Sequence, residues 1–148
     1  MSDSKLSVNS LFAARDAEAA KKRAEAEEGE RQKKAELKAF AERVLAYNIT
    51  DEDRARAMAK IKKAFLDKER EVMLTHFPSD LCEDRGRRIN NHLAGWQETL
   101  PGAFHQVFEW WEKELQPGGF GFSARVIDYP GGMPGDVGLF ITWPEIKE

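Results

Sequence analysis

Few residues of this sequence could carry out chemistry, and they form no catalytic pattern. The side chains that can exchange protons near neutral pH are three histidines, and Asp80 lies between two of them, His76 and His92. A zinc site would need ligands at regular spacing on one element or a second cysteine, and neither occurs. A small hydrolase or metal enzyme around His76, Asp80 and His92 is therefore an alternative only. A non-enzymatic protein is favoured, and no catalytic residue, metal or cofactor is assigned.

The single cysteine, Cys82, is predicted to be a small buried hydrophobe. Glu83 and Asp84 follow it, and negative charges there disfavour a reactive thiolate. One cysteine allows no internal disulfide, which fits a reducing compartment. Because the N-terminus lacks the apolar core of a secretory signal and no apolar stretch could cross a bilayer, we expect a cytoplasmic protein without membrane contact.

Two basic clusters suit phosphate groups and make a nucleic-acid-associated protein the first alternative. Residues 54–70 carry seven Lys and Arg against Asp67 and Glu69, and residues 85–88 form a second cluster. Neither half of the chain is strongly basic, however, since residues 1–75 carry 17 Lys and Arg against 15 Asp and Glu. The candidate phosphate contacts are Arg56, Lys60, Lys63 and Arg70 on one predicted helix face, with Arg85, Arg87 and Arg88.

Three large apolar residues are candidates for a protein-binding surface. Phe104, Phe108 and Trp111 recur at helical spacing and predict a core-facing stripe. Trp110 should then point sideways, where it either covers the edge of the core or anchors a partner. In the alternating segment that follows, Ile127 and Phe140 fall on the second face of a predicted sheet. The predicted partner-binding residues are therefore Trp110, Ile127 and Phe140.

The arrangement of turn-forming residues divides the chain near Thr75. All six prolines, all four tryptophans and ten of the eleven glycines come after it. Residues 1–36 are predicted to be a mobile or protruding charged helical segment. From Ala13 to Glu36 that segment consists almost wholly of strong helix formers and has no apolar residue larger than Ala. It therefore cannot build a core of its own.

Residues 37–75 are predicted to form a helical hairpin. Leu37, Phe40 and Val44 give the first helix an apolar stripe. Thr50 and Asp53 resemble a capping box that starts a second helix, expected to run to about Leu74. The two helices should pack antiparallel.

Residues 76–148 are predicted to be a compact α+β module. A helix over 101–116 ends at Pro117, Gly118 and Gly119. Two alternating runs, 120–126 and 137–143, flank a Gly- and Pro-rich loop and indicate a two-stranded antiparallel β-hairpin. The helix should pack across one face of that hairpin, since two strands alone are marginally stable. What covers the other face is left open between the helical hairpin and a partner.

The predicted fold class is α+β, with a charged N-terminal helix, a helical hairpin, and a C-terminal helix on a β-hairpin. Apolar side chains on both faces of the hairpin and an N-terminal helix without a core suggest one piece of an assembly. We therefore expect a non-catalytic protein-interaction module, an adaptor or assembly subunit. Its partner would be another protein or a second copy of the chain.

Overall fold

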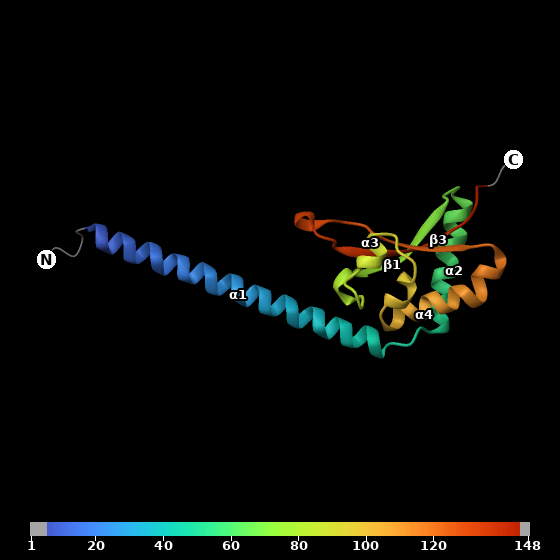
Figure 1. Cartoon of the computed structure of the whole chain (residues 1–148), viewed down its shortest axis with the longest axis horizontal. Coiled ribbons are helices and arrows are strands. Elements are labelled where there is room, and N and C mark those ends of the chain that lie inside the picture. Colours follow the sequence, from blue (N-terminus) through green and yellow to red (C-terminus); the bar gives the residue numbers. More distant parts are fainter. Residues whose placement is uncertain (1–5, 146–148) are drawn as a thin grey trace. The chain divides into compact units, whose positions relative to one another are not determined.

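The computed structural model describes residues 6–145, and over these residues it contains four α-helices and three β-strands (Figure 1). The chain divides into two compact units, of which the first ends at Ala41 and the second begins at Glu42. Helices and an antiparallel sheet occur together, so the predicted α+β class is confirmed. The middle of the chain differs from the prediction.

Helix α1 spans Val8–Ala46 and begins earlier than the Ala13 indicated by composition. The Ser7 hydroxyl accepts the Ser10 backbone N–H at 3.0 Å, and the Ser10 hydroxyl accepts the Ser7 N–H at 3.2 Å. This reciprocal pair satisfies free backbone donors at the helix start in the manner of a capping box. Nearly all side chains of α1 are exposed, and Val44 is its buried residue.

The end of α1 and the linker after it are fixed to helix α4 (Gly102–Trp110) within the second unit. Gly102 has a positive φ of 35°, and a Cβ there would overlap the backbone of Val44. The Gln106 side chain accepts the backbone N–H of Ile49 at 2.8 Å and donates to the Tyr47 carbonyl at 3.1 Å. Glycine is thus required for the close approach, and Gln106 then holds the linker in place.

Helix α2 spans Asp51–Leu66 and has the predicted capping box. The Thr50 hydroxyl accepts the Asp53 N–H at 3.1 Å, while the Asp53 carboxylate accepts the Thr50 N–H at 3.0 Å. The same carboxylate accepts the Tyr47 hydroxyl, and this hydrogen bond is the main cause that lowers the pKa of Asp53. The capping-box motif in the sequence therefore predicted the start of α2 correctly.

The predicted helical hairpin over 37–75 is wrong, because α2 ends at Leu66 and not near Leu74. Lys68 adopts a positive φ of 66°, which stops the helix, and residues Glu71–Pro78 form strand β1. Helix α2 packs on β1 within the second unit. The segment Val72–Phe77 fits a half-buried strand as well as a helix end, so its long-range pairing decided its conformation.

The sheet has three antiparallel strands in the order β1-β3-β2, so the predicted two-stranded hairpin is incomplete. Strands β2 (Gly121–Val126) and β3 (Asp136–Thr142) pair as expected, with Val126 opposite Val137. Strand β1 adds to the other side of β3, with Phe77 opposite Val137 and a register irregularity between Met73 and Thr75.

One face of β3 supplies the centre of the core. Val137, Leu139 and Ile141 have no exposed surface, and they alternate with residues of the other face. Across the ladder, Phe122 pairs with Ile141 on the core face and contacts Trp111 with ring centroids 5.5 Å apart. The predicted alternation of the C-terminal strands is therefore confirmed. Two further short elements are α3 (Arg87–Asn90) and the turn Trp96–Thr99. The turn supplies Trp96, whose ring stacks on Phe122.

Of the two positions left open for Trp110, the edge of the core or a partner-facing anchor, the structure shows burial in the core: Trp110 and Trp111 are both buried, at 7% and 9% exposure. Helix α4 passes into a π turn over Trp111–Leu115, whose wider turn changes the direction of successive side chains. The Trp110 indole donates to the Glu114 carboxylate at 2.9 Å, and the Trp111 indole donates to the Phe120 carbonyl at 3.0 Å. Both rings therefore lie in the core with their N–H groups satisfied.

We expect Trp110→Ala and Trp111→Ala each to lower the free energy of unfolding by about 3–5 kcal/mol, because each empties a buried aromatic site. The control Met133→Ala removes a side chain that is 69% exposed and should cost less than about 0.5 kcal/mol. Urea denaturation followed by circular dichroism measures all three. A cost for Trp110→Ala no larger than that of the control would contradict its place in the core.

Candidate interaction groove

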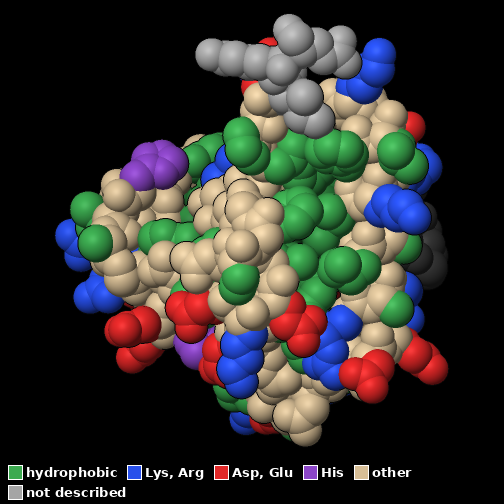
Figure 2. Space-filling model, turned by 90° about the vertical axis from the view of Figure 1, so that its right-hand side faces the viewer, with side chains coloured by type: hydrophobic (Ala, Val, Ile, Leu, Met, Phe, Trp, Pro, Cys, Tyr) green, Lys and Arg blue, Asp and Glu red, His purple; other side chains and the backbone are tan. Residues whose placement is uncertain are grey.

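A groove lies between α2 and the π turn, and it adjoins a buried cluster shared by these elements and β3. Ile61 of α2, Trp110, Leu115 of the π turn and Ile141 of β3 belong to that cluster, and Trp110 also lines the groove. Figure 2 shows hydrophobic side chains gathered into one continuous area on this face of the molecule, bordered by Lys and Arg and by Asp and Glu. We call this feature the interaction groove.

Aromatic side chains form one end of the groove. The Trp143 ring lies 5.9 Å from the Phe65 ring and 6.3 Å from the Phe120 ring, measured between centroids. The Trp143 indole donates to the Glu69 carbonyl at 2.9 Å, which fixes its orientation. These contacts hold the aromatic rings in place while Phe65 stays 42% exposed, so apolar surface is presented to solvent on a fixed support.

The α2 wall of the groove is a stripe of residues at helical spacing. Arg54, Met58, Ile61 and Phe65 recur at intervals of four, three and four and therefore share one face of the helix. Met58 is 49% exposed, beside the buried Ile61. This face of α2 is thus only partly covered by the chain itself.

The opposite end of the groove is a polar cleft of about 470 Å³. Trp110 lines it together with charged residues of both signs from α2, α4 and the π turn. Glu109 in this cleft is paired with His105 at 2.8 Å, and Glu114 accepts the Trp110 indole. The lining carries three acids, Asp51, Glu109 and Glu114, and two bases, Arg54 and Lys113, so the cleft has charges of both signs. The lining residues are Ile49, Asp51, Arg54, Gln106, Glu109, Trp110, Lys113 and Glu114.

The second face of the sheet is covered by its own side chains, which answers the question the sequence left open. Phe140 is only 5% exposed, and the Arg125 guanidinium lies 3.7 Å from the centre of its ring. Glu71 holds that guanidinium with contacts of 3.1 and 2.6 Å. These two contacts hold the cation over the ring, and the hydrogen bond and charge of Glu71 also raise the pKa of Arg125.

The three predicted partner-binding residues do not form one surface. Ile127 and Phe140 meet above Gly138, where a Cβ would lie 2.9 Å from Ile127 and 2.8 Å from Phe140. Trp110 belongs to the cluster around Ile141, on the opposite face of the sheet. The structure therefore places Trp110 at the groove and leaves Ile127, at 40% exposure, on the other side. The helical spacing in the sequence places Met58 and Phe65 on one face of α2, but only the structure brings the Trp143 ring beside Phe65.

The basic residues considered for nucleic-acid contact are spread over the second unit. Arg70 lies beyond the end of α2 and pairs with Glu145 at 2.6 Å, so it does not extend a basic helix face. Lys63 pairs with Asp67 at 3.6 Å, and Lys60 donates to the Leu74 carbonyl at 3.2 Å. Arg56 pairs with Asp53. These contacts use part of the positive charge that a phosphate backbone would need.

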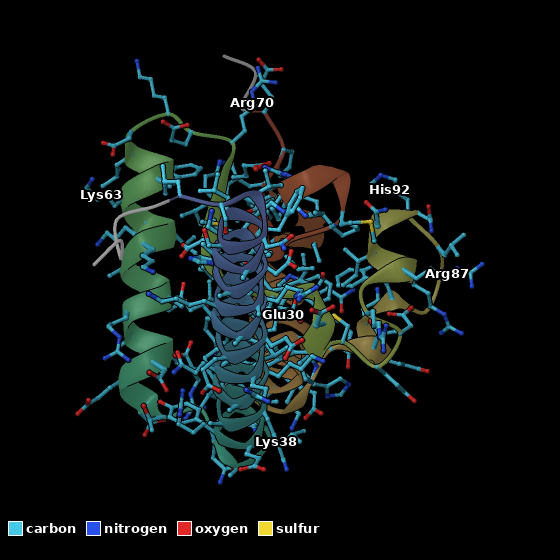
Figure 3. The ribbon with its side chains drawn as sticks, turned by 90° about the vertical axis from the view of Figure 1, so that its left-hand side faces the viewer. Glu30, Lys38, Lys63, Arg70, Arg87 and His92 are labelled. Carbon is cyan, nitrogen blue, oxygen red and sulfur yellow. The ribbon has the colours of Figure 1, made fainter. Side chains whose placement is uncertain are left out.

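The second basic cluster lies elsewhere. Arg87 and Arg88 belong to α3, and Arg85 precedes it with a positive φ of 59°. In Figure 3, Lys63 on α2 and Arg87 on α3 extend outward on opposite sides. The two clusters therefore form no continuous stripe.

The histidines and acids of the enzymatic alternative are not brought together. His76 is half-exposed and pairs with Asp136 at 2.8 Å, whereas His92 follows α3 with a positive φ of 54°. Over residues 6–145, no group of three or more His, Cys, Asp or Glu side chains could hold a metal ion. Cys82 is buried, and burial, followed by the charge of Asp84, raises the pKa of its thiol to about 12.

No protein-family model matches the sequence, and neither a curated protein nor a solved structure gives a significant match. No helix in the described part of the chain is long and apolar enough to cross a membrane.

Cys82 should react very slowly with a disulfide reagent in the folded protein. A thiol pKa of about 12 in place of 9.0 lowers the thiolate fraction near neutral pH by about a thousandfold, and burial adds a steric barrier. Absorbance-monitored modification in native buffer and in denaturant measures the difference. Equal rates in the two conditions would contradict both the burial and the raised pKa.

Proposed function

We propose that the protein is a non-catalytic protein-interaction module, an adaptor or assembly subunit, which binds its partner in the interaction groove. The observation that carries this proposal is the exposure of Met58 and Phe65 beside aromatic rings that the chain itself holds in position. Exposed apolar surface on a rigid support binds at a low ordering cost, because the receptor side is already arranged. Trp110 contributes to the contact because it lines the groove.

The occupant that fits this groove is an amphipathic helical segment of the partner. The groove runs between two helical walls, and such grooves accept apolar side chains spaced at i, i+3, i+4 and i+7. Its apolar anchors would contact Met58 and Phe65, and its flanks would be charged. An acidic residue would face Arg54 and a basic residue would face Glu109 or Glu114, which lie at the polar end.

Groove binding can be tested with a displayed library of amphipathic helical peptides selected on the full-length protein. We expect Met58→Asp to weaken the selected peptides by at least about tenfold, because it places a charge among the apolar contacts. Met73→Asp is the matched control, since Met73 is 39% exposed on a strand and not on the α2 wall. The indole N–H resonance of Trp143 should shift when the peptide binds.

Two results would contradict the groove as the contact surface. One is a library that yields no binder affected by Met58→Asp, and the other is an equal loss with Met73→Asp. Salt-dependent binding of generic DNA or RNA, abolished by neutralising Arg56 and Lys63, would instead favour the nucleic-acid alternative. Turnover or bound metal that depends on His76 and His92 would favour the enzymatic one.

A further inference from the structure

The large apolar side chains of α1 lie only near its two ends. At the beginning of the helix Val8, Leu11 and Phe12 are 65%, 54% and 48% exposed. Toward its end Leu37 and Phe40 are half-buried. From Ala13 to Glu36 the helix has no apolar residue larger than Ala. Exposed Leu and Phe at the start of a helix that is otherwise highly charged need a partner that covers them.

The apolar residues at the two ends share one face of the helix. At about 100° per residue, Phe12 and Leu37 point within about 20° of each other, although 25 positions separate them. Ala19 and Ala26 lie on the same face between them. Small side chains there allow a second helix to approach closely, while the charged residues that interrupt the face can extend their heads to solvent.

Charge along α1 is arranged in blocks that decide the direction of pairing. Lys21–Arg23 is basic, residues 25–30 carry four Glu, and residues 31–34 are basic again. Two parallel helices in register would place each block beside its own copy. The charge pattern thus disfavours a parallel pair.

An antiparallel pair centred on residue 25 resolves this repulsion. Residues of the two copies whose numbers add to 50 are then at the same level along the pair, so Arg23 faces Glu27 along one flank of the contact face. Lys34 faces Asp16 in the same register, and Glu25 facing its own copy is the one like-charge opposition among the described residues of α1. The same register brings the exposed Leu11 and Phe12 of one helix beside Leu37 and Phe40 of the other.

We propose that α1 is a self-association surface through which two copies of the chain pair antiparallel about residue 25. The apolar ends supply the contact, and the charge blocks set its direction and register. This inference gives the proposed interaction module a second copy as one partner. It does not depend on the interaction groove, because its residues all belong to α1.

Sedimentation equilibrium of the full-length protein tests the pairing. We expect Leu11→Asp/Phe12→Asp to weaken dimerisation by more than about tenfold, because it charges both apolar contacts of the symmetric pair. The matched control Ala17→Asp/Ala24→Asp adds the same two charges on the other side of α1 and should leave the dimer unchanged. Circular dichroism confirms that α1 stays helical in both variants.

Charge reversal tests the register. Arg23→Glu should weaken the dimer, because it sets the new carboxylate of each copy against Glu27 of the other. Adding Glu27→Arg should restore it, since the swapped pair is again complementary both within and between helices. The wild-type and doubly reversed proteins therefore should dimerise alike, and the single variant less.

A spin label tests the direction. In a Cys82→Ser background, a label at Ala14→Cys lies 11 residues from the proposed centre, so the two labels should be about 33 Å apart along the axis. A parallel pair would place them less than about 20 Å apart. A chain that is monomeric at all concentrations, a short label distance, or equal loss with the control variant would overturn the pairing. A monomer that still binds groove peptides would leave the proposed function intact.

Discussion

The structure depends on the burial of strand β3. Val137, Leu139 and Ile141 lose all contact with water, and β3 has a hydrogen-bonded neighbour on each side. Removing these three side chains from solvent contributes roughly 1.5–3 kcal/mol each to the gross stabilisation of the fold. Both edge strands pair with β3, and α2 and α4 contribute side chains to the cluster that covers its core face.

The two faces of the sheet are protected from solvent in different ways. Helical segments and aromatic rings cover the core face, but α2 and the π turn leave a groove between them. On the other face Phe140 lies flat beside Gly138, under an arginine held by Glu71. A charge-paired guanidinium shields the Phe140 ring from solvent on that face.

The stability of helix α1 has a different source. Its middle has no side chain that could be buried to advantage, so its helicity comes from local propensity and from close acid–base pairs such as Glu28 and Arg31. At 39 residues it would extend about 58 Å. Apolar residues at the start of such a helix add nothing to its own core, and the proposed self-association would cover them.

The sequence by itself determined the features that depend on neighbours in the chain. Alanine and charged residues predict α1, Thr50 and Asp53 place the start of α2, and strict alternation predicts β2 and β3. What only the tertiary structure decided depends on distant contacts. Strand β1 exists because residues 71–78 pair with residues 136–142, and its own pattern fits a helix end equally well. Trp110 is buried because a π turn redirects the side chains around it, and the groove forms from residues of α2, the π turn and β3. Local periodicity does not show which distant segment will hydrogen-bond to a strand or cover an aromatic ring. These features therefore depend on how the whole chain packs.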